Sequence, residues 1–258
     1  KEKERAELAK AELAKAEAER QAAESAAEAG QEDAQEQAYP ALGGQEREEH
    51  KDEALDALLR RIRKETDPIR YKDLSVRIRE KVSPLVAAKN FDRVFDVMTI
   101  FLKDSSSLSN LPEGVKEIAS DSLDAVFDAD IIQYLITRMA ARDNNRHDVL
   151  QQLILKARDP AIEPLLCALI ESPEVSIRRL YYDTLLLFGN AIRPHVEKKT
   201  AGNEWYAIRQ MVALLGDLGD PASIGALEEA YGSDDLRIKK EVLKSVVSIR
   251  SPRSTALL

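Results

Sequence analysis

A cationic side chain recurs along the second half of this sequence at an almost constant spacing. The positions are Lys116, Arg146, Arg178, Arg209 and Lys239, separated by 30, 32, 31 and 30 residues. Each cation precedes a run in which apolar residues return every three or four positions, as on one face of an α-helix. This repeat predicts stacked copies of one small unit, because a single unit of that size cannot bury its own apolar face.

Each unit is predicted to contain two antiparallel helices. A first helix begins at Asp159-Pro160-Ala161 and again at Asp220-Pro221-Ala222, with Asn190-Ala191-Ile192 at the equivalent place between them. A second helix follows, and around Arg178 it has a regularly spaced core face: Ile177, Leu180, Tyr181, Thr184, Leu185 and Phe188. The prediction is an all-α fold, an α-solenoid of antiparallel helix pairs.

The second helices are predicted to start at capping residues. Ser172, Asn203 and Ser233 each lie six residues before a cation. Their side chains are suited to accept hydrogen bonds from the free backbone N–H groups of a first helical turn. Pro173 would then occupy the first helical position, where its missing N–H is not needed.

The unit resembles the HEAT-repeat family, in the short bacterial form that is similar to the repeats of bilin-lyase-like proteins. The resemblance is carried by Asp-Pro-Ala at 159–161 and 220–222, and by the segments 175–178 (Val-Ser-Ile-Arg), 206–209 (Tyr-Ala-Ile-Arg) and 236–239 (Leu-Arg-Ile-Lys). It is good over 145–258, fair over 112–144 and weak over 51–111. These motifs specify a fold well and a function poorly.

Four segments are predicted along the chain. Residues 1–38, rich in Ala, Glu and Lys, are predicted to form a charged helical spacer rather than a coiled coil, because a five-residue period gives no coiled-coil seam. Toward its end, after Gly30, the segment is polar and is expected to be disordered. Residues 39–50 are a linker, residues 51–111 are divergent helical repeats or an N-terminal cap, and residues 112–258 are HEAT-like repeats. Within 51–111, Ser83-Pro84 is predicted to start a new helix. The last repeat, which begins at Ser251-Pro252, is truncated, so we expect the natural protein to continue past Leu258.

Charge is concentrated in the N-terminal segment. Residues 1–50 carry seven Lys and Arg against fourteen Asp and Glu, whereas the other 208 residues carry 31 against 32. A balanced body offers no long-range attraction for nucleic acid or an anionic membrane. The sequence also has no run of about 18 apolar residues and no signal-peptide pattern after Lys1. We therefore expect a cytoplasmic protein without a membrane span, for which nucleic acid is not the favoured partner.

Catalytic and metal-binding signatures are missing from the sequence. His50, His147 and His195 lack metal-ligand spacing, and no His-Glu dipeptide of the kind that binds iron in HEAT-fold hydroxylases occurs. The single cysteine, Cys167, lies among leucines and is expected to be a buried apolar residue. There is no glycine-rich phosphate loop and no Ser/His/Asp signature. The prediction is therefore a protein that is not an enzyme and needs no cofactor or metal.

The recurring cations have two interpretations. In the first, they are structural: their aliphatic chains lie on the core and their charged groups bond to carboxylates or carbonyls of the repeats. Alternatively they form part of a strip that receives a partner, since the family resemblance implies that second helices line the concave side of the solenoid. The candidate partner-binding residues of that strip are Arg179, Tyr182, Asp183, Leu186, Trp205, Tyr206, Gln210, Leu214 and Lys240.

The predicted function is a non-catalytic scaffold that binds another protein, or another domain of its own longer chain. Two alternatives remain open at this stage. One is a HEAT-like enzyme of the bilin-lyase or DNA-glycosylase type, and the other is a nucleic-acid-binding solenoid. A neighbouring helix of the solenoid would also explain the apolar strip if it covered those residues.

Overall fold

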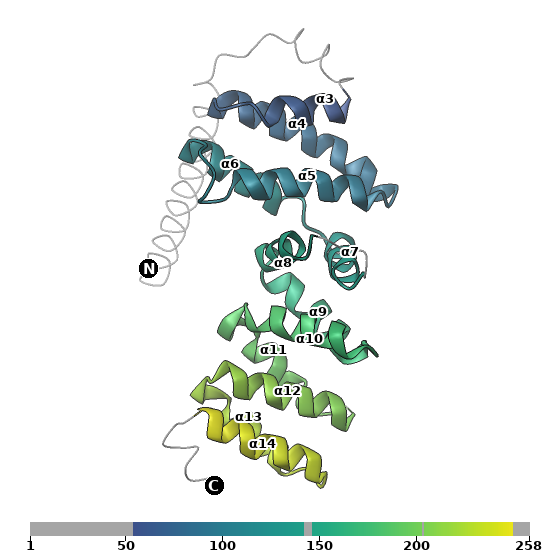
Figure 1. Ribbon diagram of the computed structural model, residues 1–258, viewed down its shortest axis with the longest axis vertical. Helices are drawn as coiled ribbons and strands as arrows, with labels where there is room; N and C mark the ends of the chain where they lie inside the picture. Colours follow the sequence, from purple (N-terminus) through teal and green to yellow (C-terminus); the bar gives the residue numbers. More distant parts are fainter. Residues whose placement is uncertain (1–53, 142–145, 203, 250–258) are drawn as a thin grey trace, which may run out of the picture. The chain divides into compact units, whose positions relative to one another are not determined.

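The computed structural model describes residues 54–141, 146–202 and 204–249, and over these residues the fold is all-α. Helices are labelled as in Figure 1. The described residues form twelve α-helices: α3 (Leu55–Ile62), α4 (Pro68–Ala87), α5 (Phe91–Asp104), α6 (Glu113–Asp124), α7 (Ala129–Met139), α8 (His147–Lys156), α9 (Asp159–Glu171), α10 (Val175–Leu186), α11 (Arg193–Lys198), α12 (Trp205–Leu218), α13 (Ile224–Tyr231) and α14 (Leu236–Ile249). The predicted spacer, the linker and the restart at Ser251-Pro252 lie outside the described residues.

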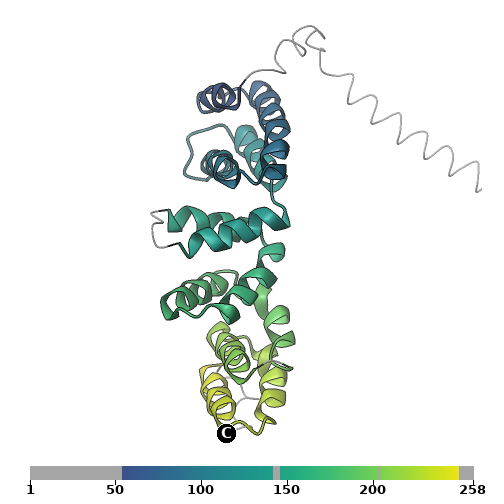
Figure 2. The same cartoon turned by 90° about the vertical axis from the view of Figure 1, so that its right-hand side faces the viewer.

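Helices that follow one another in the chain pack against each other as pairs. Contacts join α3 to α4, α5 to α6, α7 to α8, α9 to α10, α11 to α12 and α13 to α14. Successive pairs also touch, because α10 packs on α12 and α12 packs on α14 (Figure 1). Figure 2 shows α10, α12 and α14 in one layer and α9, α11 and α13 in another. Sequential pairs stacked in this way are consistent with a solenoid.

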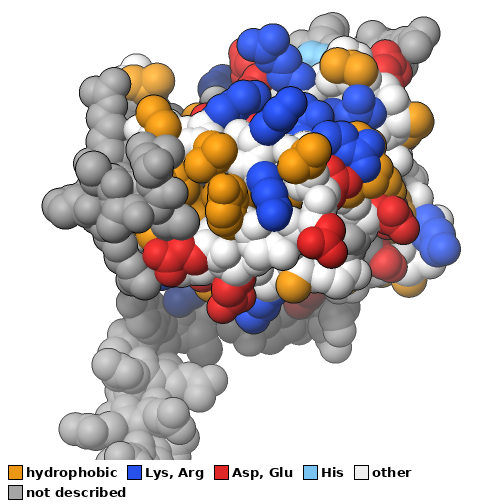
Figure 3. All heavy atoms as spheres, turned by 90° about the horizontal axis from the view of Figure 1, so that it is seen from below, with side chains coloured by type: hydrophobic (Ala, Val, Ile, Leu, Met, Phe, Trp, Pro, Cys, Tyr) orange, Lys and Arg blue, Asp and Glu red, His pale blue; other side chains and the backbone are white. Residues whose placement is uncertain are grey.

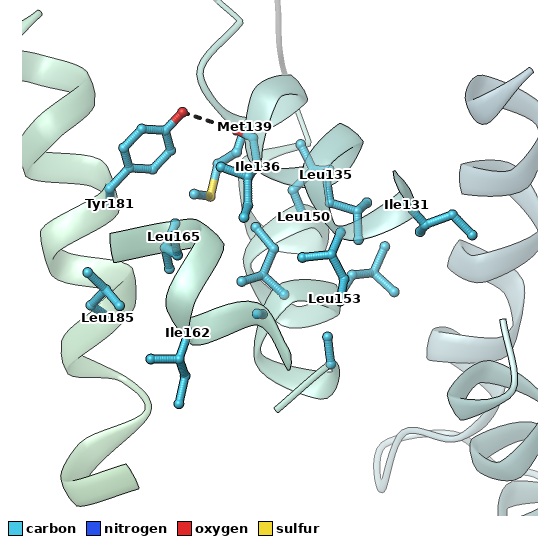
Figure 4. Packing of buried hydrophobic residues seen from close by; sticks show 14 of the residues in the cluster. Ile131, Leu135, Ile136, Met139, Leu150, Leu153, Ile162, Leu165, Tyr181 and Leu185 are labelled. Atoms are coloured by element: carbon cyan, nitrogen blue, oxygen red, sulfur yellow. Dashed lines mark hydrogen bonds between the residues drawn. The ribbon is translucent and has the colours of Figure 1, made fainter. Parts of the chain in front are cut away.

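One hydrophobic core runs through the described residues from Leu58 to Ile249. Where α7, α8, α9 and α10 meet, aliphatic side chains such as Leu135, Leu150 and Leu165 fill the centre (Figure 4). Tyr181 closes this cluster, because its hydroxyl donates to the carbonyl of Ile136 at 3.2 Å. Each pair thus buries apolar side chains both between its own two helices and against the neighbouring pairs.

The predicted first helices of the units begin where Asp-Pro motifs place them. α9 starts at Asp159, and the Asp220 carboxylate accepts from the backbone N–H of Ala222 at 2.9 Å, in a short 3-10 turn that leads into α13. A similar 3-10 turn over Gly189–Ile192 leads into α11. Asp220 therefore caps its turn for the expected reason, since the carboxylate satisfies a free N–H and proline needs none, whereas Asp159 is itself the first residue of α9 and makes no such cap.

The predicted caps of the second helices are wrong where the structure describes them. α10 begins at Val175, and Ser172 instead lies at the end of α9. The carbonyls of Ser172 and Pro173 accept bonds of 2.8 Å from the Arg178 guanidinium. α14 begins at Leu236, where the Asp235 carboxylate, rather than Ser233, accepts from the N–H of Arg237. Asn203 lies outside the described residues.

Two further expectations for local structure are wrong. Ser83-Pro84 does not start a new helix, since α4 runs on to Ala87 with Pro84 inside it. Pro84 has no N–H to donate to the carbonyl of Glu80, so the helix continues past it without that bond, while the carbonyl of Pro84 accepts from Ala88. Cys167 is not the buried apolar residue that was expected. It is only half-buried, and its thiol lies 3.9 Å from the charged Nζ of Lys199.

Helix packing continues across the predicted boundary between residues 111 and 112. α6, which lies after that boundary, packs on both α4 and α5, which lie before it. Lys156 of α8 in turn donates to Ser120 of α6 at 2.9 Å, and Tyr134 of α7 donates to Asp92 of α5 at 2.7 Å. The described residues from Ala54 onward form one compact body.

Candidate binding surface

The outward sides of α10, α12 and α14 form a surface that we call the three-helix face. On each helix it consists of four residues spaced i, i+4, i+7 and i+11, which lie within about 60° of one another around a helix axis. Its residues are Val175, Arg179, Tyr182 and Leu186 on α10, Tyr206, Gln210, Ala213 and Asp217 on α12, and Leu236, Lys240, Leu243 and Val247 on α14. None of these twelve side chains is buried.

The first row of this face is apolar and exposed on all three helices. Val175 is 70% exposed, Tyr206 is 44% exposed and Leu236 is 70% exposed. They occupy the same position in three consecutive units, three residues before the recurring cation. One exposed aliphatic side chain is unremarkable, but a repeated row of them is a feature of interaction surfaces.

Two polar contacts join the helices of the face. The Tyr182 hydroxyl donates to Oδ2 of Asp217 at 2.6 Å, linking α10 to α12. Burial and this bond together raise the pKa of Tyr182 above its ordinary value. Arg209 pairs with Glu241 at 3.2 Å, linking α12 to α14. Tyr182 and Asp217 therefore have a structural role in addition to their place on the face.

An aromatic pair lies at the start of α12 beside the start of α14. The Arg237 guanidinium lies 3.5 Å from the ring centroid of Trp205, a cation–π contact, and the Tyr206 ring meets Trp205 edge-on at 6.0 Å. Arg237 also bonds to the Asp235 carboxylate, which lowers the pKa of Asp235 to about 2. Trp205 is thus half-buried beneath Arg237, while Tyr206 is left accessible.

The structure brings most of the predicted partner-binding residues together. Arg179, Tyr182, Leu186, Tyr206, Gln210 and Lys240 lie on the three-helix face, and Trp205 lies at its edge. Asp183 is exposed beside the face and pairs with Arg179 at 3.8 Å.

Leu214 is a correction to the predicted strip. It is fully buried in the core, so it is not accessible to a partner. Its equivalent one period earlier, Asp183, is exposed, so the repeat register alone does not decide burial at this position. α12 differs from α10 in packing closely on α14.

The recurring cations themselves mostly have structural contacts. Arg178 bonds to two carbonyls at the turn between α9 and α10, Arg209 bonds to Glu241, and Lys116 lies 3.6 Å from Glu113 of its own helix. Arg146 pairs with Asp96 at 3.7 Å and lies over the ring of Phe95. These contacts favour the structural interpretation of the cations over a role in a basic stripe.

The partner-binding residues predicted from the sequence omit Val175, Leu236 and Val247. The signal was present, because Val175, Tyr206 and Leu236 share one register relative to the cations. An apolar residue in a first turn is ordinarily read as core, and only solvent exposure at 70% for two of the three shows otherwise.

Chemistry-bearing groups elsewhere in the described residues form no metal cluster. No group of three or more His, Cys, Asp and Glu side chains there is arranged to hold a metal ion. His195 Nε2 instead lies 3.0 Å from Oδ1 of Asp159, and Lys199 donates to Glu163 at 2.5 Å, a bond that raises the pKa of Lys199. In the same described ranges, no helix has the length and apolarity needed to cross a membrane.

Comparison with known proteins identifies no family. No family model matches the chain, and no curated protein matches it. Among solved structures it is similar to an engineered protein, with 13% sequence identity, a TM-score of 0.27, and coverage of 76% of this chain and 96% of that one. A match with that TM-score supports no argument about function, so the fold assignment rests on the helices described above.

Proposed function

We propose that this protein is a non-catalytic helical-repeat scaffold that binds another protein, or another domain of a longer chain, through the three-helix face. The observation that supports the proposal is the exposed apolar row of Val175, Tyr206 and Leu236. Val175 and Leu236 face solvent rather than the core, and Tyr206, which meets Trp205 edge-on, is still 44% exposed. The earlier HEAT resemblance agrees with a binding role.

The bond between Tyr182 and Asp217 and the pair between Arg209 and Glu241 contribute by fixing the spacing of the helices. A face whose helices are held in register loses little conformational freedom when a partner binds, which favours affinity. A partner that binds this face therefore meets groups whose relative positions are already fixed.

The proposal is tested by changing the apolar row without changing the core. The full chain carrying Tyr206→Ser and Leu236→Ser is compared with the wild type and with Ile69→Ser. Ile69 is a suitable control, because it is 62% exposed on α4, outside the face. Each protein is used to capture binding proteins from the source cell, and captured proteins are identified, produced separately and titrated.

The expected result is a defined protein that binds the wild type and the Ile69→Ser control but binds the double variant at least about tenfold more weakly. All three melting curves should agree closely, since exposed substitutions are usually worth less than about 0.5 kcal/mol. Equal affinity of the double variant for every captured protein would contradict the proposal.

A further inference from the structure

The α14 part of the three-helix face differs from the other two in its charge. Leu236–Ile249 contains four cations, Arg237, Lys239, Lys240 and Lys244, and one acid, Glu241. Glu241 is already engaged, because it pairs with Arg209 at 3.2 Å and with Lys244 at 3.6 Å. Arg237 is engaged as well, by the Asp235 carboxylate, so the excess of positive charge that the helix presents comes from its three lysines.

The same helix presents a row of apolar side chains between those cations. Leu236 is 70% exposed and Val247 is 54% exposed, while Leu243 is partly buried. Together with Lys240 they have the i, i+4, i+7, i+11 spacing at which one helix packs along another. Figure 3 views the end of the molecule that α13 and α14 form, and it shows Lys and Arg side chains gathered beside hydrophobic ones.

The opposite side of α14 is already packed within the protein. Val242 and Val246 lie in the core, and the Ser245 hydroxyl donates to the carbonyl of Val212 at 2.9 Å. The outward row is therefore a second apolar face on a helix whose first face is occupied. No described element covers Leu236 or Val247, since both remain more than half exposed.

We propose that this face binds an amphipathic α-helix of a partner protein that carries apolar residues at heptad spacing flanked by Asp or Glu. This inference rests on the proposed function and specifies the partner. Leu236, Leu243 and Val247 contact the apolar row of the incoming helix. Lys240 and Lys244 pair with its flanking carboxylates, as charged residues do at the edges of a helix pair.

Two other occupants that the chain itself could provide have the wrong charge, and a third, the acidic residues 1–50, has a five-residue period that gives no apolar row at heptad spacing. If two copies paired their α14 helices in antiparallel fashion about the centre of the face, Lys244 of one copy would meet Lys239 of the other. Like charges at such a contact are destabilising. Residues 250–258 carry Arg250 and Arg253 and no acid, so their charge is also of the wrong sign.

The test uses two synthetic peptides of three heptads that differ only in charge. Both have Leu at the heptad core positions, with Glu at the flanking positions in one and Lys in the other, so that each is monomeric by self-repulsion. Binding to the full chain is measured by fluorescence anisotropy. The Glu peptide is expected to bind at least about tenfold more tightly than the Lys peptide, and the difference should shrink as salt is raised.

Substitutions then locate the binding site. Lys240→Glu/Lys244→Glu is expected to reverse the peptide preference. Lys240→Gln/Lys244→Gln, which places no new negative charge beside Glu241, is expected to abolish the preference. Leu236→Ser/Val247→Ser is expected to weaken binding of the Glu peptide at least about tenfold. The matched controls on α4, Lys72→Glu and Ile69→Ser, should leave binding unchanged.

Equal binding of the two peptides, or an unchanged preference in both lysine variants, overturns the inference. Self-association of the full chain that the Leu236→Ser/Val247→Ser variant abolishes also overturns it, because the occupant would then be a second copy. The capture experiment is independent of these results. A natural partner that needs Tyr206 and Leu236 while neither peptide binds would leave the proposed function standing and remove this inference alone.

Discussion

The hydroxyl of Tyr182 donates to Oδ2 of Asp217, 35 positions later in the chain, at 2.6 Å and so joins α10 to α12. Both side chains belong to the three-helix face. Their bond means that Tyr182 cannot be removed as a simple probe of binding, because its loss also affects the packing of α10 on α12.

The first prediction concerns this bond. Tyr182→Phe keeps the ring and removes the hydroxyl, so we expect a loss of about 1 kcal/mol in the free energy of unfolding, as for a typical hydrogen bond. Asp217→Asn should cost less, because its amide oxygen can still accept from the hydroxyl. Denaturant unfolding of the two single variants and the double variant, analysed as a double-mutant cycle, checks this, and strict additivity would contradict a direct interaction.

The raised pKa of Tyr182 adds an alkaline signature. The native state holds the phenol proton more firmly than the unfolded state, whose tyrosine has its ordinary pKa of 10.0. The stability that Tyr182 contributes is therefore fully present below pH 10 and is lost as the pH rises above 10. The wild type should lose stability above pH 10 more steeply than Tyr182→Phe, as measured by urea unfolding at several pH values. Parallel curves would show that Tyr182 does not contribute.

The second prediction separates the core from the face on neighbouring helices. Leu214 is fully buried and Val247 is 54% exposed. Leu214→Ala should cost about 2–5 kcal/mol, because it removes buried methyl groups and leaves a cavity. Val247→Ala should change the free energy of unfolding by less than about 0.5 kcal/mol. Comparable losses in chemical denaturation would show that α12 or α14 is rotated from the orientation described here.

The third prediction concerns the closest approach of two helices. A Cβ atom on Gly216 of α12 would lie 2.5–2.7 Å from atoms of Ser245 on α14, including its Cα. Gly216→Ala must therefore push the helices apart, and we expect a loss of about 1–3 kcal/mol, as for other overpacked cores.

The control for Gly216 is another helical glycine. Gly225 of α13 has open space where its Cβ would be. Gly225→Ala should stabilise the protein by about 0.5–1 kcal/mol, because alanine has the higher helix propensity. Thermal melts of both variants measure the contrast, and a neutral Gly216→Ala would mean that α12 and α14 are not in close contact.

The fourth prediction concerns a buried carboxylate. Asp104 accepts a bond of 2.8 Å from the Tyr71 hydroxyl, and burial is the main cause that raises the pKa of Asp104 above 3.8. The native state thus binds the proton more firmly than the unfolded state, so stability falls as pH rises from 3.8 through the native pKa. Asp104→Asn avoids the buried charge and should be more stable than the wild type at pH 7, with the difference vanishing below pH 3.8.

Exposed Asp121 provides the matched control for the substitution itself, since Asp121→Asn should change the free energy of unfolding at pH 7 by less than about 0.5 kcal/mol. Denaturant unfolding between pH 3 and 7 measures both variants. A wild type that is more stable than Asp104→Asn at pH 7 would show instead that the ionised carboxylate stabilises the native state.

Local patterns in the sequence were sufficient for the existence and type of the elements. Asp-Pro pairs at 67, 159 and 220 correctly marked helix starts, and at 67 and 220 the aspartate caps, an interaction that depends on only a few consecutive residues. The core face of α10 was also correct, since Tyr181, Thr184 and Leu185 are buried. The period of the cations gave the succession of helix pairs before any contact was known.

Only the tertiary structure decided which residues are accessible and which polar groups meet. Leu214 and Val247 are both apolar residues of second helices, yet one is in the core and the other faces solvent, because neighbouring helices determine which side of each helix is covered. α10 starts at Val175 rather than at Pro173, and the Arg178 guanidinium bonds to the carbonyls of Ser172 and Pro173 just before it. The sequence by itself thus determined a repeated helical pair, through interactions within one turn or one helix. The three-helix face arises from contacts between residues some thirty positions apart, which no local pattern specifies.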